Sequence, residues 1–136
     1  MYKVELSQSE KWQLAYIVDV PPDLVIPPDV ETALFRIAQE ALSNARKHAQ
    51  TDHIRLSLAF QEHQIILEVQ DWGRGFRMEQ LGDERDRLGL IGMQERTALL
   101  NGTFEIESAP NAGVRIRVAI PLDITTRISP TNGDRA

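Results

Sequence analysis

The segment of residues 31–49, ETALFRIAQEALSNARKHA, constrains the fold of this 136-residue chain more than any other stretch. At the 3.6-residue period of an α-helix its apolar side chains fall on one stripe, which suits packing against a sheet. The segment therefore predicts a long amphipathic helix whose N-cap is either Asp29 or Thr32. The stripe consists of Ala33, Leu34, Ile37, Ala38, Ala41, Leu42, Ala45 and Ala49.

The opposite face of the same helix carries a row of polar side chains. Glu40, Asn44, Lys47 and His48 stand at positions i, i+4, i+7 and i+8, so their tips line one side of the helix. An acid, an amide and two cations suit a metal ion beside a polyphosphate, because oxygens bind the metal and cations bind the phosphates. An ordinary solvated face with an i,i+4 pairing explains the same row.

Composition narrows the class of protein. Hydrophobic residues make up 42% and charged residues 26%, so we expect one compact globular domain. The net charge of −5 argues against a nucleic-acid partner. No apolar run is long enough to span a bilayer and no signal-peptide pattern is present, so we expect a cytoplasmic domain without direct membrane contact. The chain has no cysteine, and its three histidines lack metal-ligand spacing, which argues against zinc.

Runs of alternating apolar residues predict five strands around two helices. The expected order is strand, helix, two strands, lid, helix and two strands, which is a two-layer α/β sandwich with a mixed, mostly antiparallel sheet and helices on one face. Residues 1–10 form a polar segment without a strong signal, 11–122 the domain, and 123–136 a frayed tail. In the final hairpin, Glu105 and Glu107 face outward opposite Arg115 and Arg117, which predicts cross-strand charge pairs on a solvated face.

The predicted strand that contains Ile65, Leu67 and Val69 ends at a carboxylate, Asp71. Asp71 falls on the same face as Ile65, Leu67 and Val69, and a buried carboxylate costs several kcal/mol unless it is hydrogen-bonded. The sequence WGRGF follows, and its two glycines allow a sharp turn and the close approach of a flat ligand. The carboxylate can accept a hydrogen bond from an exocyclic amino group, as on adenine. An Asx-turn that only stabilises the bend is the alternative.

The second helix is predicted to begin at the glycine pair Gly89 and Gly92 and to end at Asn101-Gly102. The charged residues 77–88 before it read as a mobile loop or lid. Glycines at a helix start expose unpaired backbone N–H groups, which bind anions. Close backbone packing explains the glycines about as well.

Taken in order, these segments resemble one known family. EALSNARKHA resembles the N box of the histidine kinase ATP-binding domain, DWGRGF its G1 box, and GLIGMQERTALLNG its G2 region. The resemblance extends over roughly residues 10–122. IAQEALSNARKHA and GLIGMQER resemble in particular the nitrate-sensor and desaturase-thermosensor subfamily of bacterial sensor kinases. The resemblance implies the Bergerat, or GHKL, ATP-binding fold, with ATP and Mg²⁺ as cofactors.

The resemblance also implies roles for single residues. Asn44 would coordinate Mg²⁺, with Glu40 near the metal or its waters, while Lys47 and His48 would face the phosphates. Asp71 would accept from the adenine amino group. Further residues would shape the adenine pocket or cradle the phosphates through their backbone: Gly73 and Gly75 in the pocket, and Gly89, Leu90, Ile91 and Gly92 at the phosphates.

The chain departs from the family pattern in two respects. The family has a Gly-Thr pair entering the last strand, where the hydroxyl supports the adenine site, and here the pair is Gly113-Val114. A water or the backbone must therefore replace that hydroxyl. The phosphoacceptor histidine on a dimeric helical hairpin also has no counterpart here, so we expect an excised catalytic domain.

The function implied is transfer of the ATP γ-phosphoryl group to a histidine on a separate dimerisation domain, with a response regulator downstream in two-component signalling. Such a reaction needs positioning and charge neutralisation more than covalent chemistry. Three alternatives stay open: a GHKL-type ATPase in which Glu40 activates water, an anti-sigma-like partner-switching module, and an inactive nucleotide-binding scaffold.

Overall fold

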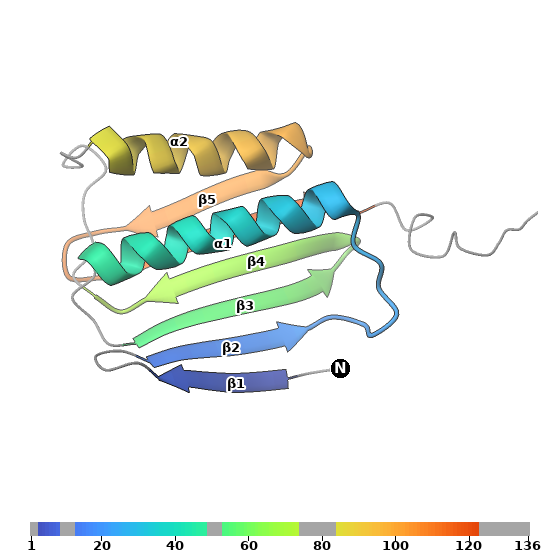
Figure 1. Ribbon diagram of the computed structural model, residues 1–136, viewed down its shortest axis with the longest axis horizontal. Coiled ribbons are helices and arrows are strands. Elements are labelled where there is room, and N and C mark those ends of the chain that lie inside the picture. The colour runs from blue at the N-terminus through green and yellow to red at the C-terminus, as the bar shows by residue number, and fades with distance from the viewer. Residues whose placement is uncertain (1–2, 9–12, 49–52, 74–83, 123–136) are drawn as a thin grey trace, which may run out of the picture.

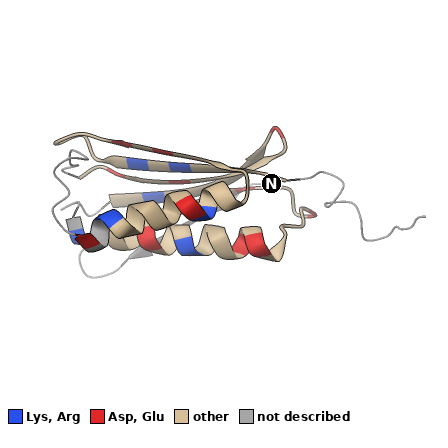
Figure 2. Cartoon of the chain, turned by 90° about the horizontal axis from the view of Figure 1, so that it is seen from above, with Lys and Arg blue, Asp and Glu red and all other residues tan. Residues whose placement is uncertain are grey.

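The computed structural model describes residues 3–8, 13–48, 53–73 and 84–122. They form a six-stranded sheet in the order β1-β2-β3-β4-β6-β5, with two helices on one face (Figures 1 and 2). The predicted two-layer α/β sandwich is confirmed. The elements are β1 (Lys3–Gln8), β2 (Gln13–Asp19), α1 (Pro28–His48), β3 (His53–Gln61), β4 (Gln64–Asp71), α2 (Glu84–Leu99), β5 (Thr103–Ser108) and β6 (Val114–Pro121).

The sheet is mixed because one connection crosses over it. β2 and β3 pair in parallel through the crossover helix α1, and the other neighbouring strands pair antiparallel. The β3–β4 hairpin turns at Glu62 and His63, whose φ angles of 52° and 63° fit the two-residue turn favoured between twisted strands. Within the described residues, no helix has the length and apolar character needed to cross a membrane.

The core lies between α1 and the centre of the sheet. Most of the predicted stripe is buried: Ile37 is fully buried, and Ala33, Leu34, Ala41 and Ala45 are nearly so. Ala38 and Leu42 are partly buried against the core, and Ala49 lies outside the described residues. Across from α1, the inner face of β4 and β6 supplies the apolar partners Ile65, Leu67, Val69, Ile116, Val118 and Ile120.

The first helix begins earlier than either predicted N-cap. The Pro27 carbonyl accepts the Glu31 N–H at 2.9 Å, so Pro27 occupies the N-cap position and Pro28 is the first helical residue, where its missing N–H costs nothing. Asp29 instead lies in the first turn and accepts the Val30 N–H at 2.8 Å. The prediction of Asp29 or Thr32 as N-cap is therefore wrong. Proline fixes φ at a helical value, so the helix starts at Pro28 instead of after a residue with a capping side chain.

The second helix also begins earlier than predicted, at Glu84 instead of Gly89. Residues 84–88, assigned to the lid, are helical because their sequence ERDRL contains adequate helix formers, and residues 77–83 lie outside the described part. The helix ends where expected. Asn101 takes a φ of 60°, and the N–H groups of Asn101 and Gly102 donate to the carbonyls of Ala98 and Thr97, as in a Schellman motif.

One strand was not predicted at all. β1 pairs antiparallel with β2 at the edge of the sheet, within the segment interpreted as a polar N-terminal stretch. Its sequence, KVELSQ, places only two apolar residues, Val4 and Leu6, between polar ones, which is a shorter alternating run than those that predicted the other strands.

Candidate functional site

Several predicted site residues lie at one edge of the molecule. α1 ends there, β4 ends there at Asp71, β6 begins there at Val114, and α2 begins there at Glu84 (Figure 1). The two helices pack on each other, and α1 packs on β4 and β6. The last turns of α1, which carry Asn44 and Lys47, are thereby brought to the same edge as the end of β4.

Asp71 is buried, with 4% of its surface exposed, on the face of β4 that the period-2 pattern predicted. Its Oδ1 accepts the Gly73 N–H at 2.9 Å, which is the Asx-turn considered as the alternative to ligand binding. Burial raises the pKa of the Asp71 carboxyl, and hydrogen bonds from the Gly73 and Val114 backbones oppose that rise. A carboxylate offers about four acceptor positions, so these bonds leave capacity for a further donor.

Gly113 and Val114, the pair that enters β6, lie against Asp71. The Val114 backbone hydrogen-bonds to the Asp71 carboxyl. Whether the backbone or a water replaces the threonine hydroxyl stays a prediction. Gly113 has a φ of 77°, and a Cβ there would overlap the Asp71 carbonyl oxygen and lie 3.2 Å from the Trp72 Cα. Only glycine fits this position without strain.

The side-chain amide oxygen of Asn44, Oδ1, is buried without a hydrogen-bond partner, which sets it apart among the described side chains. Leaving a buried acceptor unsatisfied costs about 1–3 kcal/mol, so such an atom in a folded domain calls for a ligand or an equivalent explanation. An amide oxygen is one of the hard donors that Mg²⁺ accepts.

A groove of about 590 Å³ runs between α1 and α2. It brings the predicted residues Glu40 and Lys47 together with Gly89 and Gly92, and Figure 2 shows acidic and basic positions along both helices. Arg36 and Arg96 also line the groove. Sequence reasoning missed both arginines, although Arg36 precedes Glu40 by one helical turn and could have been found from that spacing. Neither Asn44 nor Asp71 lines this groove.

The predicted phosphate cradle takes a different form in the structure. Gly89 and Gly92 lie inside α2, where backbone N–H groups donate to carbonyls four residues earlier, so the expectation of unpaired amides at a helix start is wrong here. Leu90 is buried in the core, and Ile91 is exposed. A Cβ on Gly89 would overlap the Glu40 carboxylate, whereas one on Gly92 would meet no atom within 4 Å.

Two predicted site residues receive no structural account. His48 is the last residue of α1, but its side chain is outside the described part, and Gly75 lies outside it altogether. Among the residues that are described, no group of three or more histidine, cysteine, aspartate or glutamate side chains could hold a metal ion.

Known proteins are similar to this chain in sequence and in fold. Residues 29–124 match the family described as "Histidine kinase-, DNA gyrase B-, and HSP90-like ATPase". The histidine-protein kinase/phosphatase DegS of Bacillus subtilis is 38% identical over 103 residues, which cover 75% of this chain and 27% of DegS. The oxygen sensor histidine kinase NreB of Staphylococcus carnosus is 44% identical over 96 residues, or 69% of this chain and 27% of NreB. The chain thus spans about a quarter of the length of these relatives.

Solved structures confirm the fold. The histidine kinase domain of the blue-light activated kinase EL346 from Erythrobacter litoralis superposes with a TM-score of 0.69 at 18% identity, covering 88% of this chain and 55% of that one. The histidine kinase AdeS of Acinetobacter baumannii gives a TM-score of 0.60 at 17% identity, covering 81% and 55%. The chain belongs to the family of histidine kinase-, DNA gyrase B- and HSP90-like ATPases, and it is an ATP-binding domain of the bacterial sensor histidine kinase type.

Proposed function

We propose that this domain binds ATP with Mg²⁺ and transfers the γ-phosphoryl group to a histidine on a separate dimerisation domain of a sensor kinase. A response regulator would then receive the phosphoryl group, and the reaction would take place in the cytoplasm, where ATP is supplied. The observation that carries the proposal is the buried Asn44 Oδ1, an acceptor without a partner in a domain whose relatives are kinases.

Base recognition is assigned to Asp71. Its carboxylate is fixed by two backbone hydrogen bonds and retains acceptor capacity for the adenine amino group. Guanine presents a carbonyl at the same ring position, which would set two acceptors against each other. Gly73 and Gly75 would let the base approach the turn that follows Asp71.

The phosphates and the metal are assigned to the end of α1. Asn44 Oδ1 and the Glu40 carboxylate would hold Mg²⁺, which takes one or two protein ligands and completes its shell with waters and phosphate oxygens. When bound, the ion would neutralise charge on the phosphates. Lys47, exposed at the groove, and His48 would face the phosphates. Gly89 contributes by making room for the Glu40 carboxylate, and Gly92 by leaving the groove open.

Nucleotide titration followed by phosphotransfer tests this function. Calorimetry should show ATP binding whose affinity rises with Mg²⁺. The affinity for GTP should be at least tenfold lower than that for ATP, and Asp71→Asn should lower the affinity for ATP about tenfold. Mixing the ATP-loaded domain with a dimerisation domain carrying a phosphoacceptor histidine should yield acid-labile phosphohistidine. Equal affinity for ATP and GTP would contradict the role of Asp71, and tight ATP binding without transfer to any such domain would contradict kinase activity.

The position of Glu40 favours a second candidate, an ATPase. Its carboxylate is half-buried in the groove beside Lys47, where a general base for water would have to stand. Steady-state phosphate release from this chain should stay near background because no phosphoacceptor is present. Fast release that disappears in Glu40→Gln would place the protein among the ATPases instead.

A further inference from the structure

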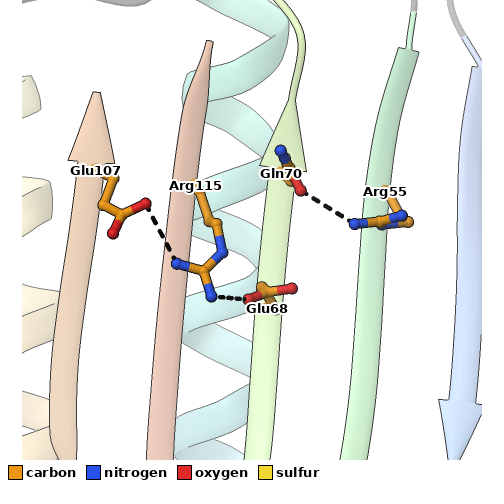
Figure 3. A network of polar contacts seen from close by, with 5 residues as sticks. All are labelled: Arg55, Glu68, Gln70, Glu107 and Arg115. Carbon is orange, nitrogen blue, oxygen red and sulfur yellow. Dashed lines mark hydrogen bonds and ion pairs between the residues drawn. The ribbon is translucent and has the colours of Figure 1, made fainter. Parts of the chain in front are cut away.

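One guanidinium group contacts both sequence neighbours of Asp71. The Arg55 Nη2 donates to the Gln70 Oε1 at 3.1 Å, and the Arg55 Cζ lies 5.4 Å from the centre of the Trp72 ring (Figure 3 shows the bond to Gln70). A guanidinium within about 6 Å of an indole centre is attracted to the ring face. Arg55 therefore joins the residue before Asp71 to the residue after it.

These contacts lie on the opposite face of the sheet from the Asp71 carboxylate. Arg55 pairs with Gln70 in the antiparallel register, while the next pair, Ile54 and Asp71, points to the helix side. Figure 3 shows the Arg55–Gln70 contact in front of the sheet, with the helices behind it. Asp71 is thus held from both sides, by backbone N–H groups on the inner face and by Arg55 through its neighbours on the outer face.

Trp72 needs such a contact because burial does not fix it. The residue is 53% exposed and follows the last residue of β4, where the sheet no longer holds the backbone on both sides. The peptide between Trp72 and Gly73 contains the N–H that donates to the Asp71 carboxylate. Movement of Trp72 would therefore change the direction in which that carboxylate points.

We propose that Arg55 is a positioning residue for nucleobase recognition. By holding Gln70 and Trp72 it keeps the Asp71 carboxylate in the orientation that accepts the adenine amino group and rejects the guanine carbonyl. The inference rests on the proposed role of Asp71 and adds a residue that touches neither nucleotide nor metal.

A second arginine on the same face provides a matched control. The Arg115 Nη2 lies 2.6 Å from the Glu68 Oε2, and its Nη1 lies 3.4 Å from the Glu107 Oε1 (Figure 3). Arg115 therefore also links strands through its guanidinium, but neither of its partners is adjacent to Asp71. A loss of sheet stability alone would affect variants of both arginines, whereas positioning of Asp71 would affect only those of Arg55.

The test uses the full chain carrying Trp12→Phe as the parent, so that Trp72 is its remaining tryptophan. Three variants of this parent are compared with it: Arg55→Met, Arg55→Lys and Arg115→Met. Arg55→Met should weaken ATP binding about two- to fivefold, the size of one exposed cation–π contact. It should also lower the ratio of ATP to GTP affinity and shift the Trp72 emission before nucleotide is added. Arg55→Lys should recover part of each effect, because lysine keeps the cation over the ring.

Arg115→Met should lower the unfolding temperature but leave ATP affinity and the ATP-to-GTP ratio at parent values. If Arg55→Met binds both nucleotides as the parent does, or if both methionine variants lose affinity equally, the inference is overturned while the proposed function stands. If the parent chain itself does not prefer ATP to GTP, the proposed role of Asp71 fails, and the inference fails with it.

Discussion

Alanine at Gly92 should stabilise α2, whereas alanine at Gly89 should not, although both glycines lie inside the same helix. Glycine in a helix interior is about 0.8–1.0 kcal/mol less favourable than alanine, because it loses more backbone freedom on folding. A Cβ on Gly92 would meet nothing within 4 Å. Gly92→Ala should therefore gain about 0.5–1 kcal/mol, which raises the unfolding temperature by roughly 2–4 °C for a domain of this size.

The same gain is opposed at Gly89 by the Glu40 side chain. A Cβ there would overlap the Glu40 carboxylate and lie 2.9 Å from its Cδ, so the carboxylate has to move. Forcing a flexible side chain out of its rotamer costs about 0.5–1.5 kcal/mol, which cancels most of the helix gain. Gly89→Ala should leave stability nearly unchanged and displace the carboxylate proposed to bind the metal.

A double-mutant cycle separates these two terms. In a Glu40→Ala background the obstruction is absent, so Gly89→Ala should then stabilise the domain about as much as Gly92→Ala does. Urea unfolding followed by circular dichroism gives the four free energies, and equal m-values would confirm that the compared states are equally compact. A coupling energy of zero between positions 40 and 89, or equal gains from both alanines in the parent, would refute the packing of Glu40 over Gly89.

The other predictions concern the edge where Asn44 and Asp71 lie. Asn44→Ala should abolish Mg²⁺-dependent phosphotransfer while metal-free nucleotide binding remains measurable by calorimetry, because the amide is assigned to the metal. Burial raises the pKa of the Asp71 carboxyl above its ordinary value of 3.8, so the folded state binds the carboxyl proton more tightly than the unfolded state does. The protonated carboxyl therefore contributes stability below pH 3.8, and this contribution is lost as the pH rises through the higher folded pKa. Urea unfolding over a pH series should therefore show Asp71→Asn gaining relative to the parent across that rise. Gly113→Ala should destabilise the fold by about 2 kcal/mol or more in the same assay, since it adds a Cβ at positive φ against the Asp71 carbonyl.

Features that depend on a local repeat were predictable from the sequence. The stripe of α1 follows from the helical period, and the inward face of Asp71 follows from counting by two along β4. The register that places Glu105 opposite Arg117 and Glu107 opposite Arg115 follows from the hairpin, and the second of these pairs forms an ion pair. In each case the residues that decide the outcome are neighbours in sequence or across one turn.

Features that depend on elements distant in sequence could not be predicted. Arg115 also pairs with Glu68, which requires knowing that β6 lies beside β4. The groove that joins Arg36 to Arg96 exists only because α1 packs on α2. The start of α2 was misplaced for a different reason: two glycines were given more weight than the helix-forming residues before them, and tertiary packing tolerates glycine inside a helix.

Two polar groups at this edge oppose folding. The Asn44 Oδ1 is buried without a partner, and the Asp71 carboxyl has a raised pKa because burial disfavours its charged form. Either group could be replaced by an apolar residue of similar size at a gain of order 1 kcal/mol in a domain whose total stability is about 5–15 kcal/mol. Both costs are removed if a ligand supplies a cation to the amide oxygen and an N–H donor to the carboxylate. A metal–nucleotide complex would carry both groups on one molecule, so under the proposed function a single ligand would remove both energetic penalties at this edge.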